Sequence, residues 1–179
     1  MRATRYDAVI FDLFGTLVDS FSAAEVERVV REMAQTVDVD TDAFVRVWER
    51  MMPDRALGRV ASIAENVALI ARQLGGTPEA ARVEAAAALR TGMARRGLVP
   101  RPDACRTLEA LRAQGLKTAL ISDCSPEVPA IWRETPLAPL MDVAILSCEV
   151  HLRKPDPRIY ALAVERLAVP PHRCLYVGD

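Results

Sequence analysis

The sequence predicts an α/β fold in which a doubly wound parallel sheet is interrupted by an all-helical insertion. Four short apolar segments have the length and composition of buried strands. Helical patterns alternate with the last three of these segments, which is typical of a doubly wound sheet. A block of consecutive helical patterns follows the first segment. Because open α/β sheets bind ligands at the carboxyl ends of their strands, the residues that follow each strand are candidate site residues.

The first predicted strand, residues 8–11, ends at Asp12, and Gly15 permits a sharp turn just beyond it. Apolar residues then recur every three or four positions, which predicts helices over 21–36, 41–52, 59–74 and 78–96. This block comes directly after the first strand, so we expect it to lie over the strand ends as a lid. Residues 97–102 contain two prolines and are interpreted as the return linker.

The second half of the chain alternates predicted helices with predicted strands. The helices span 103–114, 126–133 and 155–168, and the strands span 117–121, 142–146 and 174–177. Ser122 and Asp123 follow the second strand, Lys154 lies beyond the third, and Asp179 follows the fourth. The four strands therefore bring the carboxylates of Asp12 and Asp179, the Ser122 hydroxyl and the Lys154 ammonium group to one edge of the sheet.

The chain resembles the haloacid dehalogenase-like (HAD) hydrolase superfamily, in its helical-cap branch of phosphatases and 2-haloacid dehalogenases. The resemblance depends on four motifs in a fixed order: Asp12-Leu13-Phe14-Gly15-Thr16, Ile121-Ser122-Asp123, Lys154-Pro155-Asp156-Pro157 and Val177-Gly178-Asp179. It implies a catalytic core of residues 1–20 and 98–179 and a helical cap of residues 21–97. Related proteins continue beyond the fourth motif, so the resemblance also implies a core truncated at its C-terminal end.

The resemblance implies a role for each motif residue. Asp12 would be the nucleophile and Lys154 would keep it ionised and balance the charge of the substrate. Ser122 and the backbone at Gly15, Thr16 and Asp123 would bind the phosphoryl group, together with Lys154. Magnesium would be held by Asp12, the carbonyl of Phe14 and Asp179, because Mg²⁺ prefers hard oxygen ligands. The implied partner is a small phosphorylated substrate.

Phe14 departs from the phosphatase pattern, in which a second aspartate at this place protonates the leaving group and then activates water. A phenyl ring can do neither, and general acid–base catalysis is typically worth ~10²–10⁴-fold in rate. Three interpretations remain open. The protein is a weak Mg²⁺-dependent phosphatase, a 2-haloacid dehalogenase acting on a halogenated acid, or a degenerate relative that only binds. The dehalogenases resemble this chain at Phe14 but differ at Asp123 and at Gly178-Asp179.

The composition excludes other classes of function. The formal net charge is −1, which gives no overall positive field to attract nucleic acid. No apolar stretch is long enough to span a membrane and the start lacks a signal-peptide apolar region, so we expect a soluble, cytoplasmic protein. The four cysteines do not occur in paired spacing, which favours reduced thiols.

Basic residues add two expectations. Lys117 and Lys154 are the only lysines among 23 basic residues. Because the chain otherwise uses arginine, a lysine at position 154 indicates a functional role for a compact ammonium group. In the predicted cap, four arginines are candidates to contact an anionic substrate, and Trp48 is a candidate for an apolar wall of the substrate site. The alternative for each arginine is an ordinary surface residue. These arginines are Arg46, Arg50, Arg55 and Arg59.

Overall fold

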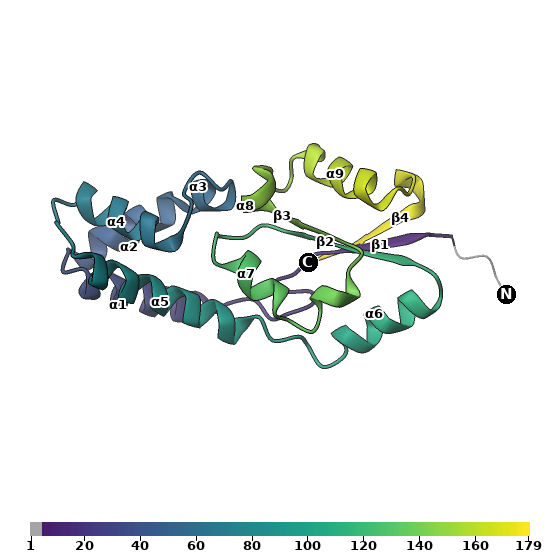
Figure 1. Ribbon diagram of the computed structural model, residues 1–179, viewed down its shortest axis with the longest axis horizontal. Helices are drawn as coiled ribbons and strands as arrows, with labels where there is room; N and C mark the ends of the chain where they lie inside the picture. The colour runs from purple at the N-terminus through teal and green to yellow at the C-terminus, as the bar shows by residue number, and fades with distance from the viewer. Residues whose placement is uncertain (1–4) are drawn as a thin grey trace.

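The computed structural model describes residues 5–179 and has two lobes, a sheet flanked by helices and a separate group of helices (Figure 1). The sheet contains β1 (Ala8–Phe11), β2 (Lys117–Ser122), β3 (Val143–Leu146) and β4 (Cys174–Val177). All pairs are parallel and the order is β3-β2-β1-β4. This topology confirms the predicted α/β fold with a doubly wound parallel sheet.

The register places the carboxyl ends of the strands at one edge. Phe11 is opposite Leu120 of β2 and Val177 of β4, and Ser122 is opposite Leu146 of β3. The residues that follow the four strands therefore lie along the same edge of the sheet. Figure 1 shows that this edge faces the helical lobe, whereas the N-terminus lies at the opposite end of the sheet.

Both faces of the sheet are covered, as its near-continuous apolar strands require. On one face, Val9, Phe11 and Leu120 pack against α6 (Ala104–Ala113) and α7 (Val128–Arg133). On the other face, Ile10 and Ile121 pack against α9 (Pro157–Leu167). Each fully buried Leu or Ile side chain contributes roughly 1.5–3 kcal/mol relative to an exposed one. The short α8 (Ser147–Val150) follows β3, and one-turn helices cover Ala138–Leu140 and Pro171–Arg173.

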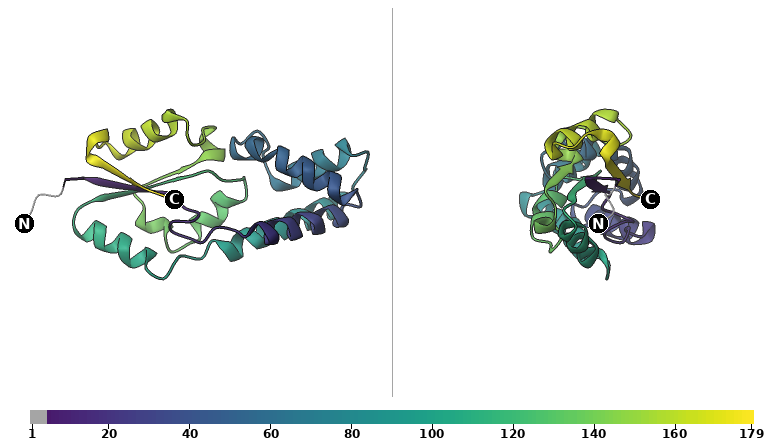
Figure 2. Two further views of the ribbon diagram at one scale, coloured as in Figure 1. Left: turned by 180° about the vertical axis from the view of Figure 1, so that it is seen from behind. Right: turned by 90° about the vertical axis from the view of Figure 1, so that its right-hand side faces the viewer.

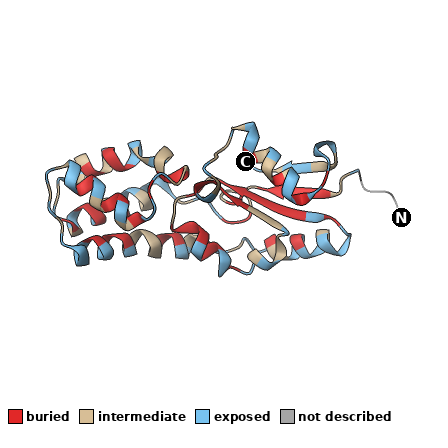
Figure 3. Ribbon diagram, turned by 45° about the horizontal axis from the view of Figure 1, so that its top comes forward, coloured by how far each residue is buried: buried red, intermediate tan, exposed pale blue. Residues whose placement is uncertain are grey.

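The helical lobe has its own hydrophobic cluster, whose fully buried members include Met33, Phe44, Ile70 and Met93. Its helices are α1 (Ala23–Thr36), α2 (Thr41–Arg50), α3 (Met52–Ala56), α4 (Ile63–Gln73) and α5 (Ala80–Gly97). Seen from behind, α1 and α5 run side by side along the lobe (Figure 2). Burial follows the same plan, with buried positions on the faces where the helices meet (Figure 3).

Two of the predicted helices differ from the observed ones. The predicted helix over 41–52 is divided at Met51, because Pro53 occupies the first turn of α3, where its missing N–H costs nothing. The predicted helix over 59–74 begins only at Ile63, because the Ser62 hydroxyl caps it by accepting from the Glu65 N–H at 3.0 Å.

The two connections between the lobes are joined by hydrogen bonds. Val18 and Pro100 form an isolated antiparallel bridge, and the Arg101 N–H donates to the Leu17 carbonyl at 2.9 Å. Phe21 packs so closely on Gly97 that a Cβ at position 97 would collide with its ring. The two chain segments that connect the lobes are therefore paired side by side. Within residues 5–179, no helix is both long and apolar enough to cross a bilayer.

Candidate active site at the strand ends

Asp12 directly follows β1, and only one of its two carboxylate oxygens is engaged by neighbouring groups. Its backbone N–H donates to the Val177 carbonyl at 2.9 Å, which continues the β1–β4 pairing by one residue. The Oδ1 atom accepts from the Leu13 N–H at 2.7 Å and lies 2.7 Å from the Lys154 ammonium nitrogen. In the described part of the chain Oδ2 takes no hydrogen bond, so this oxygen is the one available to a substrate.

Lys154 reaches Asp12 from the loop between α8 and α9. Its backbone N–H donates to Oδ1 of Asp123 at 3.0 Å, so the residue after β2 positions the loop that carries the lysine. Burial of the ammonium group lowers the pKa of Lys154, but the hydrogen bond and the charge of Asp12 outweigh it, and the net pKa is raised. Lys154 is therefore charged at neutral pH and stabilises an ionised carboxylate beside it.

Asp179 lies against the turn that follows Asp12. A Cβ at Gly15, whose φ of +79° favours glycine, would collide with the Asp179 carboxylate. A Cβ at Gly178 would lie 3.2 Å from Cβ of Asp12. Asp12 and Asp179 thus follow adjacent strands, and carboxylate oxygens are ligands that Mg²⁺ prefers. Among the described residues, no three His, Cys, Asp or Glu side chains are grouped as a metal site.

Ser122 is fully buried at the end of β2, and its hydroxyl has no hydrogen-bond partner within residues 5–179. A buried hydroxyl without a partner costs about 1–3 kcal/mol, and such a group in a native structure calls for an explanation. A phosphoryl or carboxylate oxygen bound at the strand ends would supply the missing partner.

Phe14 and Thr16 occupy the turn between Asp12 and the first connection to the helical lobe. The Phe14 ring packs on Phe21 with a centroid distance of 5.2 Å, so it faces the lobe junction. The Thr16 N–H donates to the Leu13 carbonyl at 3.3 Å and closes the turn. No protonatable side chain stands at position 14 beside the nucleophile.

Two further residues that the sequence did not single out support this site. The Tyr176 hydroxyl lies 3.5 Å from the Lys154 ammonium nitrogen, and burial is the main cause of its raised pKa. Arg101 donates to the Gly15 carbonyl at 2.9 Å and pairs with Asp19 at 2.8 Å, which braces the turn. The sequence gives no sign of these roles, because Arg101 is one of 21 arginines and Tyr176 is an ordinary strand residue.

The arginines of the helical lobe divide into two groups. Arg46, Arg50 and Arg59 are exposed, and Arg59 pairs with Asp54. Arg55 is buried, with its guanidinium 3.9 Å above the Trp48 ring and bonded to the Trp48 carbonyl at 2.7 Å. Trp48 is thus covered by Arg55 within the lobe. Burial lowers the pKa of Arg55 to about 10, which leaves it charged at neutral pH.

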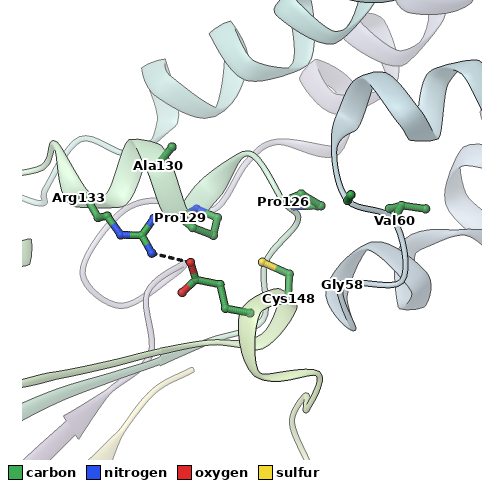
Figure 4. Close-up of a pocket in the computed structure, with 9 residues that line it drawn as sticks. Gly58, Val60, Pro126, Pro129, Ala130, Arg133 and Cys148 are labelled. Carbon is green, nitrogen blue, oxygen red and sulfur yellow. Dashed lines mark hydrogen bonds and ion pairs between the residues drawn. The ribbon is translucent and has the colours of Figure 1, made fainter.

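A hollow of about 310 Å³ opens at the outside of the lobe junction (Figure 4). Gly58 and Val60 border it from the helical lobe, and Pro126, Pro129 and Cys148 border it from the sheet lobe. It contains none of the strand-end residues described above. Cys148 and Cys124 are free thiols with their sulfurs 3.6 Å apart, in keeping with the reduced state expected from the sequence.

The geometry brings the Asp12 carboxylate at the end of β1 within 2.7 Å of the Lys154 ammonium group, at the edge of the sheet that faces the helical lobe. The profile of the haloacid dehalogenase-like hydrolase family matches residues 6–179, and the chain belongs to this family. This confirms the resemblance drawn from the four motifs.

Individual relatives differ in their reactions. The chain is 28% identical to (S)-2-haloacid dehalogenase 4A of Burkholderia cepacia, over 96% of this chain and 74% of that protein. It is also 28% identical to a glyceraldehyde 3-phosphate phosphatase of Methanopyrus kandleri, over 96% of this chain and 75% of that protein. A HAD family enzyme of Bacteroides thetaiotaomicron has the same fold, with a TM-score of 0.72 at 17% identity, over 98% of this chain and 85% of that chain.

Proposed function

We propose that this protein hydrolyses phosphate esters of small molecules through a covalent aspartyl phosphate on Asp12, with Mg²⁺ as cofactor. The observation that carries the proposal is the arrangement of two carboxylates at the adjacent ends of β1 and β4 with one ammonium group that reaches Asp12 from the loop between α8 and α9. Asp12, Asp179 and Lys154 together leave one negative charge, which attracts a divalent cation. With the cation bound, a phosphate dianion can approach the carboxylates without net repulsion.

The residues would act in order along one reaction path. Oδ2 of Asp12 attacks phosphorus, the bond to the leaving oxygen breaks, and the leaving group takes a proton from water because Phe14 offers none. Water then attacks phosphorus of the aspartyl phosphate, which releases inorganic phosphate and restores the carboxylate. Lys154, the Ser122 hydroxyl and the backbone at Asp123 would hold the phosphoryl oxygens. The expected contribution of Gly15 and Thr16 is not kept, because their N–H groups already donate to the carbonyls of Val18 and Leu13. Mg²⁺ held by Asp12, Asp179 and the Phe14 carbonyl would neutralise developing charge.

In this proposal the helical lobe, residues 21–97, is a cap over the core of residues 1–20 and 98–179. The strand ends face this lobe, and the paired connections at Val18 and Pro100 would be the place where the two move relative to each other. The substrate would lie between the lobes, as we expected from the position of the helical block in the sequence.

A second candidate function is 2-haloacid dehalogenation, and Phe14 favours it. A halide leaves without a proton, so an aromatic residue beside the nucleophile costs that reaction nothing. Under this alternative the Asp179 carboxylate would have no cation to bind, which is why we rank it second. A catalytically degenerate protein that only binds is the third interpretation left open by Phe14.

One assay separates these candidates. Hydrolysis of 4-nitrophenyl phosphate is measured with Mg²⁺ and with EDTA, in parallel with halide release from 2-chloropropionate. The proposal predicts phosphate release that depends on Mg²⁺ and no halide release. Halide release that is indifferent to EDTA would establish the dehalogenase instead, and no turnover of either substrate would leave the binding-only relative.

A further inference from the structure

Two of the four cysteines lie side by side beyond the carboxyl ends of β2 and β3. Ser122 and Leu146 are opposite each other in the sheet, and each chain segment continues by two residues, to Cys124 and to Cys148. Neighbouring strands lie about 4.8 Å apart, within the roughly 4.4–6.8 Å that separates the Cα atoms of bonded cysteines. The two sulfurs are 3.6 Å apart, so the spacing of the two segments suits a disulfide.

Hydrogen bonds hold the two cysteine-bearing segments together. The hydroxyl of Ser147, the residue before Cys148, accepts from the Cys124 N–H at 2.9 Å. The same hydroxyl donates to the Cys124 carbonyl at 3.4 Å, and Ser147 is fully buried. The two thiols therefore stay within reach of each other without any movement of the strands.

Cys148 is the thiol that meets an oxidant first. It borders the hollow of about 310 Å³ at the outside of the lobe junction, which admits a molecule as small as hydrogen peroxide (Figure 4). The hydrogen bond from the Cys124 thiol lowers the pKa of Cys148, against burial and the charges of Glu149 and Glu127. The same hydrogen bond raises the pKa of Cys124. Because the thiolate is the reactive form of cysteine, Cys148 is the attacking thiol and Cys124 is the one that completes the disulfide.

Both segments also contact the parts of the molecule that position the candidate active site. Cys124 directly follows Asp123, whose Oδ1 accepts from the Lys154 N–H at 3.0 Å. The Cys148 carbonyl lies so close to Gly58 of the helical lobe that a Cβ at position 58 would collide with it. A shift of the cysteines therefore moves the loop that carries Lys154 and the contact between the lobes.

We propose that Cys124 and Cys148 are a modification site for hydrogen peroxide, which oxidises them to a disulfide and thereby slows turnover at the strand ends. A bond of about 2.05 Å between the sulfurs requires them to approach by roughly 1.5 Å. A misplacement of about 1 Å at a site costs up to ~10²-fold in rate, so we expect kcat to fall by roughly 10-fold or more. The inference goes beyond the proposed function, because it holds for whichever substrate Asp12 attacks.

The oxidation proceeds in two steps. The Cys148 thiolate attacks one oxygen of hydrogen peroxide, the O–O bond breaks, and the departing hydroxide takes up the proton that Cys148 lost on ionising. The Cys124 sulfur then attacks the sulfenic acid on Cys148, the S–O bond breaks, and the departing hydroxide takes the Cys124 proton. The two thiols lose two electrons and two protons, and one peroxide is reduced to two water molecules.

The test combines mass spectrometry with kinetics. The protein is treated with hydrogen peroxide, its remaining thiols are blocked with iodoacetamide, and it is digested with trypsin without reduction. Because cleavage at Arg133 separates the two cysteines, the disulfide appears as two linked peptides. We expect this linkage, a fall in kcat of roughly 10-fold or more for 4-nitrophenyl phosphate or 2-chloropropionate, and recovery of both changes with dithiothreitol.

Variants of the individual cysteines define their roles. Cys148→Ser forms no disulfide and keeps its kcat in peroxide, and Cys148→Ala is the second variant if Cys148→Ser does not fold. Cys124→Ser stops at the sulfenic acid, which dimedone traps on Cys148. The matched control is the double variant Cys105→Ser/Cys174→Ser, which removes the two free cysteines outside the pair and behaves as the wild type does.

Three results contradict the inference. They are reaction of peroxide at Cys105 or Cys174 without the linked peptides, a disulfide between Cys124 and Cys148 that leaves kcat unchanged, and a loss of kcat that persists in the folded Cys148 variant. The disulfide is detected by mass alone, so a protein that turns over neither substrate still confirms or rejects the modification site. Failure of the proposed function is thereby distinguished from failure of this inference.

Discussion

The strand ends and the interior of the lobe junction both hold buried or half-buried charges, and they differ in how those charges are held. At the strand ends, Asp12 and Lys154 pair at 2.7 Å, and backbone hydrogen bonds from Leu13 and to Asp123 hold the two residues in place. In the junction, Arg90 and Glu127 come from different lobes and remain without aligned hydrogen bonds. The first arrangement is complete within the sheet lobe, whereas the second depends on where the helical lobe sits. We therefore expect changes at the strand ends to alter the chemical step.

The largest effect expected at the strand ends comes from Asp12→Asn. An amide oxygen is too weak a nucleophile to form the covalent intermediate, so kcat falls by roughly 10³-fold or more. The circular dichroism spectrum should not change, because the amide can still accept from Leu13 and Lys154. Turnover close to the wild-type rate in a folded variant would reject the covalent mechanism assigned to this residue.

Phe14→Asp tests whether the site at the strand ends lacks only a general acid–base carboxyl group. A carboxyl at this place could protonate the leaving oxygen and activate water, and we expect a gain of roughly 10²-fold in the rate of 4-nitrophenyl phosphate hydrolysis. Phe14→Leu is the control, since it opens the same space against Phe21 without adding an acid, and it should gain nothing. A folded Phe14→Asp variant that binds Mg²⁺ but shows no gain counts against the phosphatase interpretation of the other motifs.

Magnesium binding should be weak and should depend on Asp179. Calorimetry of Asp179→Ala is expected to show affinity reduced by roughly 10-fold or more, because one of two carboxylate ligands is lost. Asp38→Ala, an exposed carboxylate of the helical lobe, should bind Mg²⁺ as the wild type does. Tight binding that survives the loss of Asp179 would mean that the fourth motif does not hold the metal, and it would favour the dehalogenase alternative.

A smaller effect is expected on stability from Lys154→Met, which leaves the Asp12 carboxylate half-buried without its cation. The free energy of unfolding should fall by about 1–2 kcal/mol at neutral pH, less than for a fully buried pair. Because the folded-state pKa of Lys154 is raised, its contribution is fully present below the ordinary lysine value and is lost as the pH rises through the folded-state value. Urea titrations should therefore show a constant difference from about pH 7 to about pH 10, and a shrinking one above that. A difference that already shrinks below pH 9 contradicts the raised pKa.

The strand ends and the long helices were predictable from the sequence. Asp12, Ser122 and Asp179 were foreseeable because parallel strands deliver whatever follows them to one edge, and short apolar strands are easy to recognise. The long helices were foreseeable from their periodicity, although Pro53 and Ser62 set boundaries that periodicity does not show.

The junction could not be predicted in the same way. Arg55 was one of four equivalent candidates, and only tertiary packing distinguishes it, since it lies over Trp48 while its neighbours Arg50 and Arg59 are exposed. Arg90 and Glu127 meet across sequence-distant helices with no motif at either position. Contacts between side chains on packed helices depend on helix orientation, which a linear pattern does not encode.

The most direct test of the central claim is the mass of the protein during turnover. Wild type and Asp12→Asn are mixed with 4-nitrophenyl phosphate and Mg²⁺, quenched in acid within the first turnover, digested and analysed by mass spectrometry. The account predicts one phosphoryl group on the peptide that contains Asp12, and no such adduct in Asp12→Asn. Release of phosphate by the wild type with no adduct on that peptide, or with an adduct on another residue, contradicts it.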